Sequence, residues 1–185
     1  GMSETIIGKW LKARGNREAV HLFTKVNSGK TPGGLKADAI KTAIEASLQR
    51  LQTDYVDLYF SHWPDDEASH EETLGAYDVL IRSGKVRVIG ASNYTAAMVK
   101  EANETAVIKS LQRYEVLQPR YNLYDRAEFE ALREVVLAEQ IGTVVYYSLA
   151  SGFLTGKYRS KADFGKSPRG GGAEKYLDAK GERIL

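Results

Sequence analysis

The chain has 185 residues, 43% hydrophobic and 27% charged, a composition that excludes a largely disordered protein. Its net charge of +2 gives no electrostatic reason to expect nucleic acid or an anionic membrane as a partner. It contains no cysteine, which excludes disulfides, thiolate nucleophiles and cysteine-ligated zinc. No stretch approaches the roughly 18 apolar residues of a membrane span. We therefore expect a cytoplasmic protein.

Helical and strand-like patterns alternate along the chain. Short apolar stretches rich in β-branched residues predict five strands, over residues 19–26, 55–62, 86–92, 114–122 and 142–149. Apolar residues spaced three and four apart predict six helices, over residues 3–13, 36–52, 71–83, 95–104, 126–139 and 173–184. Ser3 is the expected N-cap of the first helix, and residues 27–34 are expected to form a loop. Strands separated by helices indicate an α/β fold with a parallel sheet.

Every predicted strand carries a polar side chain at or near its C-terminal end. These residues are Lys25, His62, Ser92 with its neighbour Asn93, Gln118 and Tyr146. The carboxyl ends of parallel strands share one edge, where barrels and doubly wound sheets bind their ligands. One polar residue at a strand end means little, but five in succession suggest a single site.

His62 and Lys25 each allow a functional and a structural interpretation. His62 ends an apolar strand where the chain turns outward, a position that suits an imidazole donating a hydrogen bond to a carbonyl. A histidine without a catalytic role is the alternative. Lys25 ends another apolar strand, where a buried ammonium is costly without a partner. Its alternative is a lysine whose charged end extends to solvent at the rim of the sheet.

Several common motifs are missing or incomplete in the sequence. No GxGxxG fingerprint occurs, and Gly152–Lys157 is too short for a phosphate-binding P-loop, with Tyr158 in place of the Ser or Thr that holds magnesium. The three histidines have no metal-ligand spacing, so no metal site is expected. The acidic cluster between Asp65 and Glu72 is interpreted as a solvated loop followed by a first helical turn.

Six stretches, in order, resemble the motifs of one enzyme family. They are SETIIGKWL, FTKV, SLQRLQTDYVDLYFSHWP, SGKVRVIGASN, LQPRYNLYDR and SGFLTGKY. In these stretches the chain resembles the aldo-keto reductases, from Ser3 almost to Leu185. The resemblance implies a (β/α)8 TIM barrel that reduces aldehydes or ketones by hydride transfer from NADPH. About five βα units are covered, so residues 1–185 are expected to form a single partial barrel domain.

The resemblance also implies roles for individual residues. Lys25 is similar to the lysine that lowers the pKa of a catalytic tyrosine, and His62 to the histidine that orients the carbonyl. Among the cofactor residues that it implies, Ser92, Asn93 and Gln118 hold the nicotinamide carboxamide and Tyr146 stacks on the ring. The others follow at the pyrophosphate: Tyr147, Ser148, Leu149, Gly152, Leu154, Gly156 and Lys157. Tyr147 and Ser148 replace the Ser and Pro of many relatives. Trp63 and Tyr94 are the expected substrate wall.

The family has two βα units before the matching part and one after it. Those units carry the catalytic tyrosine, its aspartate partner and the residues that bind the cofactor's adenosine. We therefore expect either a longer reductase or a truncated barrel whose open edges a homo-oligomer or another chain covers. The expected partner is a small carbonyl compound. The alternative function is a regulatory module that binds NADP(H) without turnover, or an inactive fragment.

Overall fold

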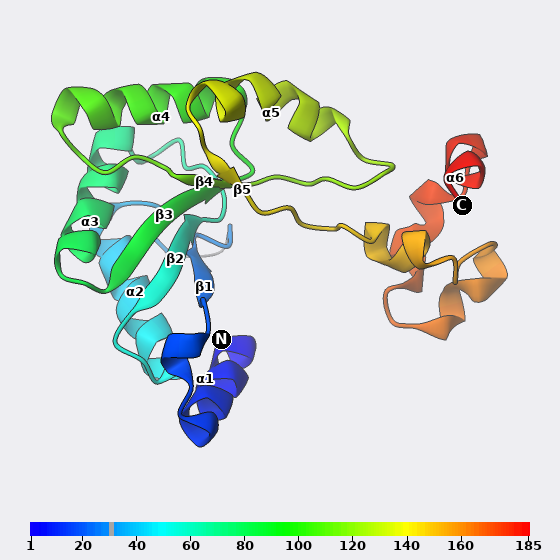
Figure 1. Ribbon diagram of the computed structural model, residues 1–185, viewed down its shortest axis with the longest axis horizontal. Coiled ribbons are helices and arrows are strands. Elements are labelled where there is room, and N and C mark those ends of the chain that lie inside the picture. Colours follow the sequence, from blue (N-terminus) through cyan, green and yellow to red (C-terminus); the bar gives the residue numbers. More distant parts are fainter. Residues whose placement is uncertain (30–31) are drawn as a thin grey trace.

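The computed structural model describes residues 1–29 and 32–185 (Figure 1). Residues 30 and 31 of the expected 27–34 loop lie outside the described residues. Five parallel strands form one sheet, and neighbours in the sheet are neighbours in the sequence. The strands are β1 (Phe23–Val26), β2 (Val56–Ser61), β3 (Val86–Ser92), β4 (Val116–Gln118) and β5 (Gly142–Thr143). This α/β arrangement agrees with the predicted incomplete (β/α)8 barrel.

One helix precedes β1, and one helix follows each of the strands β1 to β4. They are α1 (Met2–Arg14), α2 (Ala37–Leu51), α3 (His70–Arg82), α4 (Ala96–Lys109) and α5 (Ala127–Ala138). Consecutive helices pack against each other along the sheet (Figure 1). The predicted apolar spacing of α2 is confirmed, because Ile40, Ile44, Leu48 and Leu51 are all buried in the core beneath it. Ser69 begins α3 by accepting a hydrogen bond from the Glu72 backbone.

Three predicted strands are shorter in the structure by four residues or more, and the predicted strand 55–62 loses one residue at each end. The first begins four residues later than predicted, at Phe23, and its predicted first residue, Ala19, ends a 3-10 turn that begins at Arg17. The stretch 114–122 pairs only over β4, because Pro119 has no N–H to donate to a ladder. The stretch 142–149 is reduced to β5 and an isolated bridge between Arg120 and Tyr146, since this edge strand has a single neighbour.

The predicted helix ends also differ at both termini of the chain, and the helix predicted over 95–104 extends to Lys109. Ser3 is not an N-cap, because α1 already begins at Met2. The predicted helix 173–184 is divided into a 3-10 segment, Gly170–Tyr176, and α6 (Ala179–Ile184). Asp178 causes the division by leaving the helical conformation and capping α6 through the Gly181 N–H.

A second cluster of buried residues lies in the C-terminal part of the chain. It contains Ala150, Phe153, Tyr158, Ala173 and Tyr176. The rings of Phe153 and Tyr176 stack at 5.4 Å between their centroids. Figure 1 shows this orange and red part set apart from the sheet, beyond the extended connection that follows β5. The Tyr176 hydroxyl donates to Asp125 at 2.7 Å and so fastens the cluster to the connection that follows β4.

Gly90 in β3 allows a close approach that any larger residue would prevent. A Cβ at this position would lie 2.6 Å from Cε1 of Phe60 and 2.7 Å from the Val116 carbonyl oxygen. Backbone on one side and a buried ring on the other leave neither neighbour free to move.

We therefore predict that Gly90→Ala lowers the free energy of unfolding by about 1–3 kcal/mol, measured by urea denaturation. Gly75→Ala is the matched control, because nothing lies within 4 Å of its added Cβ in α3. There alanine should be neutral or stabilise the protein by up to about 1 kcal/mol. Equal effects of the two substitutions would contradict the close packing at Gly90.

Candidate functional site

A hollow of about 790 Å³ lies at the carboxyl ends of the strands. It is lined by Lys25, His62, Trp63, Ser92, Asn93, Gln118, Arg120, Tyr146, Tyr147, Ser151, Arg169 and Gly172. We call it the strand-end hollow. All the strand-end side chains that the sequence predicts to share one site lie in it, and their individual roles stay predictions.

The strand pairing explains why these residues meet. Lys25 of β1 lies opposite Phe60 of β2, and the His62 N–H continues that pairing by donating to the Val26 carbonyl at 2.9 Å. Ser92 of β3 lies opposite Gln118 of β4. Parallel strands in this register end at one edge, so the residues at their ends become neighbours.

Lys25 and His62 share an environment that disfavours positive charge. Lys25 is half-buried and has no carboxylate partner within the part of the chain that the structure describes. Burial lowers the pKa of Lys25 below its ordinary value. Burial also lowers the pKa of His62, and the positive charge of Lys25 lowers it further. His62 is therefore a neutral imidazole at pH 7, with one N–H to donate and one nitrogen to accept.

Hydrogen bonds link four of the strand ends, those of β2, β3, β4 and β5. The Tyr146 hydroxyl donates to Oδ1 of Asn93 at 2.9 Å. Nδ2 of Asn93 donates to the His62 carbonyl at 2.8 Å, and the Ser92 hydroxyl donates to the Gln118 carbonyl at 2.8 Å. The network fixes the Tyr146 hydroxyl on Asn93 and leaves the Gln118 side-chain amide without a partner among the described residues. That amide is available to a ligand.

Comparison with known proteins agrees with this geometry. A sequence model of the aldo/keto reductase family matches residues 1–178. The chain belongs to the aldo/keto reductase family. It is 37% identical over 168 residues to the aldo-keto reductase YhdN of Bacillus subtilis, covering 89% of this chain and 49% of that protein. It is 35% identical over 187 residues to the protein tas of Escherichia coli, covering 88% and 54%.

The name of a third relative of this aldo/keto reductase chain includes a cofactor. It is the aldo-keto reductase yakc [NADP(+)] of Schizosaccharomyces pombe, 33% identical over 171 residues, with 89% of this chain and 49% of that protein covered. The chain spans about half the length of the curated relatives it matches.

Most of the residues that the family resemblance assigns to the pyrophosphate do not line the strand-end hollow. Tyr147 does, but Ser148, Leu149, Gly152, Leu154, Gly156 and Lys157 do not. The backbone is left-handed at Tyr147, Ala150, Ser151 and Gly152, which turns the chain away from the sheet and into the C-terminal cluster. The Lys157 side chain lies against Gly152, where a Cβ would be 3.0 Å from its Cε.

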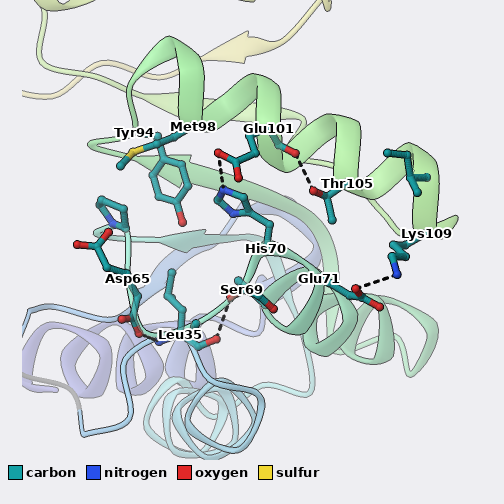
Figure 2. Close-up of a pocket in the computed structure, with 15 residues that line it drawn as sticks. Leu35, Asp65, Ser69, His70, Glu71, Tyr94, Met98, Glu101, Thr105 and Lys109 are labelled. Atoms are coloured by element: carbon teal, nitrogen blue, oxygen red, sulfur yellow. Dashed lines mark hydrogen bonds and ion pairs between the residues drawn. The ribbon is translucent and has the colours of Figure 1, made fainter.

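Tyr94, which the family resemblance assigns to a substrate wall, does not line the strand-end hollow. Only 6% of its surface is exposed, and its hydroxyl lies 3.5 Å from that of Tyr114 in the core. It borders a separate cavity of about 500 Å³, the α3–α4 cleft, where Figure 2 shows its ring beside His70 and Met98. Of the two residues expected to form a substrate wall, Trp63 alone lines the strand-end hollow.

Asp65, the first residue of the acidic cluster that extends to Glu72, has a structural role. Asp65 accepts hydrogen bonds from the backbone of Leu35 at 2.7 Å and of Glu67 at 3.0 Å, and so holds two loops together. Within residues 1–29 and 32–185, no group of three His, Asp or Glu side chains could hold a metal ion. None of the helices described is long and apolar enough to cross a membrane.

The strand-end hollow also contains residues that the sequence did not single out. Arg120, Ser151, Arg169 and Gly172 line it. Arg120 follows Gln118 by two positions, and a period of two puts both on one face of an extended segment. That signal was available in the sequence. The other three come from the irregular C-terminal part, where no periodicity predicts which way a side chain faces.

The electrostatic coupling between Lys25 and His62 gives a testable prediction. In an NMR titration His62 should lose its proton with a midpoint below the ordinary 6.5, because burial and Lys25 both oppose its charge. Lys25→Met should raise this midpoint without restoring it fully, since burial is the larger cause. Lys9→Met, which removes a charge from the exposed side of α1, should leave it unchanged. A midpoint that does not respond to Lys25→Met would contradict the coupling.

Proposed function

We propose that this chain forms the cofactor- and substrate-binding part of an oxidoreductase that reduces aldehydes or ketones to alcohols with NADP(H). One observation carries the proposal: Lys25 and His62 line the same hollow as the hydroxyl and amide groups of Ser92, Asn93 and Gln118. The family and the reductase names of its relatives support carbonyl reduction. NADP(H) is supported by the name of one relative.

The residues of the strand-end hollow fit such a cofactor chemically. Lys25, Arg120 and Arg169 line it, and no described carboxylate does, which suits a ligand that carries phosphates. The partnerless Gln118 amide and the hydroxyl of Ser92 suit a carboxamide, and the Tyr146 ring offers a flat surface for stacking. Bound NADPH supplies a hydride to the carbonyl carbon.

The protein groups of the hollow then act on the carbonyl oxygen. Neutral His62 donates a hydrogen bond to this oxygen, and the Lys25 ammonium stabilises the negative charge that develops on it. Burial raises the pKa of Tyr146, so this residue keeps its proton and serves as a platform. A raised pKa makes Tyr146 a poorer acid and its hydroxyl already donates to Oδ1 of Asn93, so we assign the proton that the alcohol oxygen gains to the catalytic tyrosine that the family resemblance implies.

His62→Ala tests the proposal. We expect kcat/KM for benzaldehyde to fall by about 100-fold or more, because a positioned hydrogen-bond donor to the developing negative charge on the oxygen is lost. The Kd of NADPH, measured by fluorescence quenching, should stay within about twofold, since His62 is assigned to the carbonyl. His70→Ala is the matched control: His70 lines the α3–α4 cleft, and its loss should leave turnover unchanged.

Unchanged turnover in His62→Ala would contradict the role of this residue. Binding of NADPH without oxidation by any of several aldehydes would contradict the reductase and favour a module that only senses the cofactor. Absence of both binding and turnover would contradict the proposal as a whole.

A further inference from the structure

Arg120 has an unusual position among the arginines of the chain. Its Nε is buried and has no hydrogen-bond partner among the described residues. The guanidinium carbon lies 5.8 Å from the centroid of the Tyr146 ring and 5.5 Å from that of Tyr147. Two aromatic rings therefore flank a cationic group on the wall of the strand-end hollow.

The charge of Arg120 is not neutralised by a carboxylate. Seven other arginines each form an ion pair with an acidic side chain: Arg17, Arg50, Arg82, Arg87, Arg113, Arg126 and Arg133. Glu128 accepts a hydrogen bond from the Arg120 backbone N–H at 3.1 Å, but no ion pair joins Glu128 to the guanidinium in the part of the chain described. A buried donor of a charged group that stays unpaired is costly, and proteins keep such groups where a ligand satisfies them.

The other charged groups of the hollow reinforce this preference. Lys25 and Arg169 add positive charge, and the described lining holds no carboxylate to oppose it. A planar guanidinium offers parallel N–H donors that match the two oxygens of a carboxylate or a phosphate.

We propose that Arg120 binds an anionic oxygen group of a ligand in the strand-end hollow. Two ligands offer such a group: a carbonyl substrate that carries a carboxylate, and the diphosphate of the cofactor. This inference rests on the proposed function and adds a selective contact to it. A carboxylate at Arg120 makes the protein select charged aldehydes over neutral ones, because the same contact is absent from a neutral compound.

The test compares binding of three probes by isothermal titration calorimetry at one fixed salt concentration. The probes are inorganic diphosphate, 4-carboxybenzaldehyde and its neutral counterpart methyl 4-formylbenzoate. The variants are Arg120→Gln, which removes the charge, and Arg120→Lys, which keeps a point charge without the planar donors. Arg133→Gln is the control, because it removes an exposed arginine of α5 and changes the net charge equally. Circular dichroism verifies that each variant is folded.

We expect Arg120→Gln to weaken one anionic probe by about tenfold or more, the loss typical of a charge-assisted hydrogen bond, and to leave the ester unchanged. Arg120→Lys should recover part of the affinity. A loss confined to 4-carboxybenzaldehyde assigns the site to the substrate, and a loss confined to diphosphate assigns it to the cofactor.

Three results would overturn the inference. The unchanged protein could bind neither anion, or Arg120→Gln could bind both anions as tightly as the unchanged protein does. The third is that Arg120→Gln loses as much affinity for the neutral ester as for the anionic probe. Because these readouts need no turnover, they are independent of the reductase assay. A protein without reductase activity can still bind an anion at Arg120, and an active reductase can fail this test.

Discussion

The parallel register between β2 and its two neighbours is the constraint on which the site depends. Val26 pairs with Ser61, and Ser61 pairs with Ala91, so three strands end at the same height. A slip of one residue would turn every side chain of a strand to the opposite face. Lys25 would then point into the helices and away from the hollow. The positions of the side chains at the strand ends therefore depend on the backbone hydrogen bonds that pair the strands several residues earlier.

Asp57 holds this register at the opposite end of β2. Its carboxylate is buried and accepts from the Leu22 N–H and from Arg17, both at 2.8 Å, and from Arg87 at 2.6 Å. These donors come from the segments before β1 and from β3, so one carboxylate joins three strands. A buried charge that is paired from several sides fixes one arrangement and disfavours shifted ones, whatever its net contribution to stability.

The sequence predicted helices and strands where the apolar periodicity is strong, and it made no reliable prediction where that periodicity is weak. Sequence patterns predicted the order of the strands and of the helices up to α5, and polar residues at strand ends predicted six of the residues that line the hollow. The direction of Tyr94 could not be predicted, because it follows Asn93, whose left-handed backbone (φ 60°) redirects the chain toward the helices. Beyond Tyr146, 3-10 turns and glycines carry no period, so residues such as Lys157 were assigned by resemblance alone.

Hydrogen–deuterium exchange with and without NADPH tests most directly whether the strand-end hollow is the ligand site. We expect slower exchange on NADPH addition in residues 90–93 and 116–122, which carry Ser92, Asn93 and Gln118. Residues 98–109 of α4, which border the α3–α4 cleft, should not change. Protection confined to α3 and α4, or no protection at the strand ends at a saturating concentration, would contradict the account.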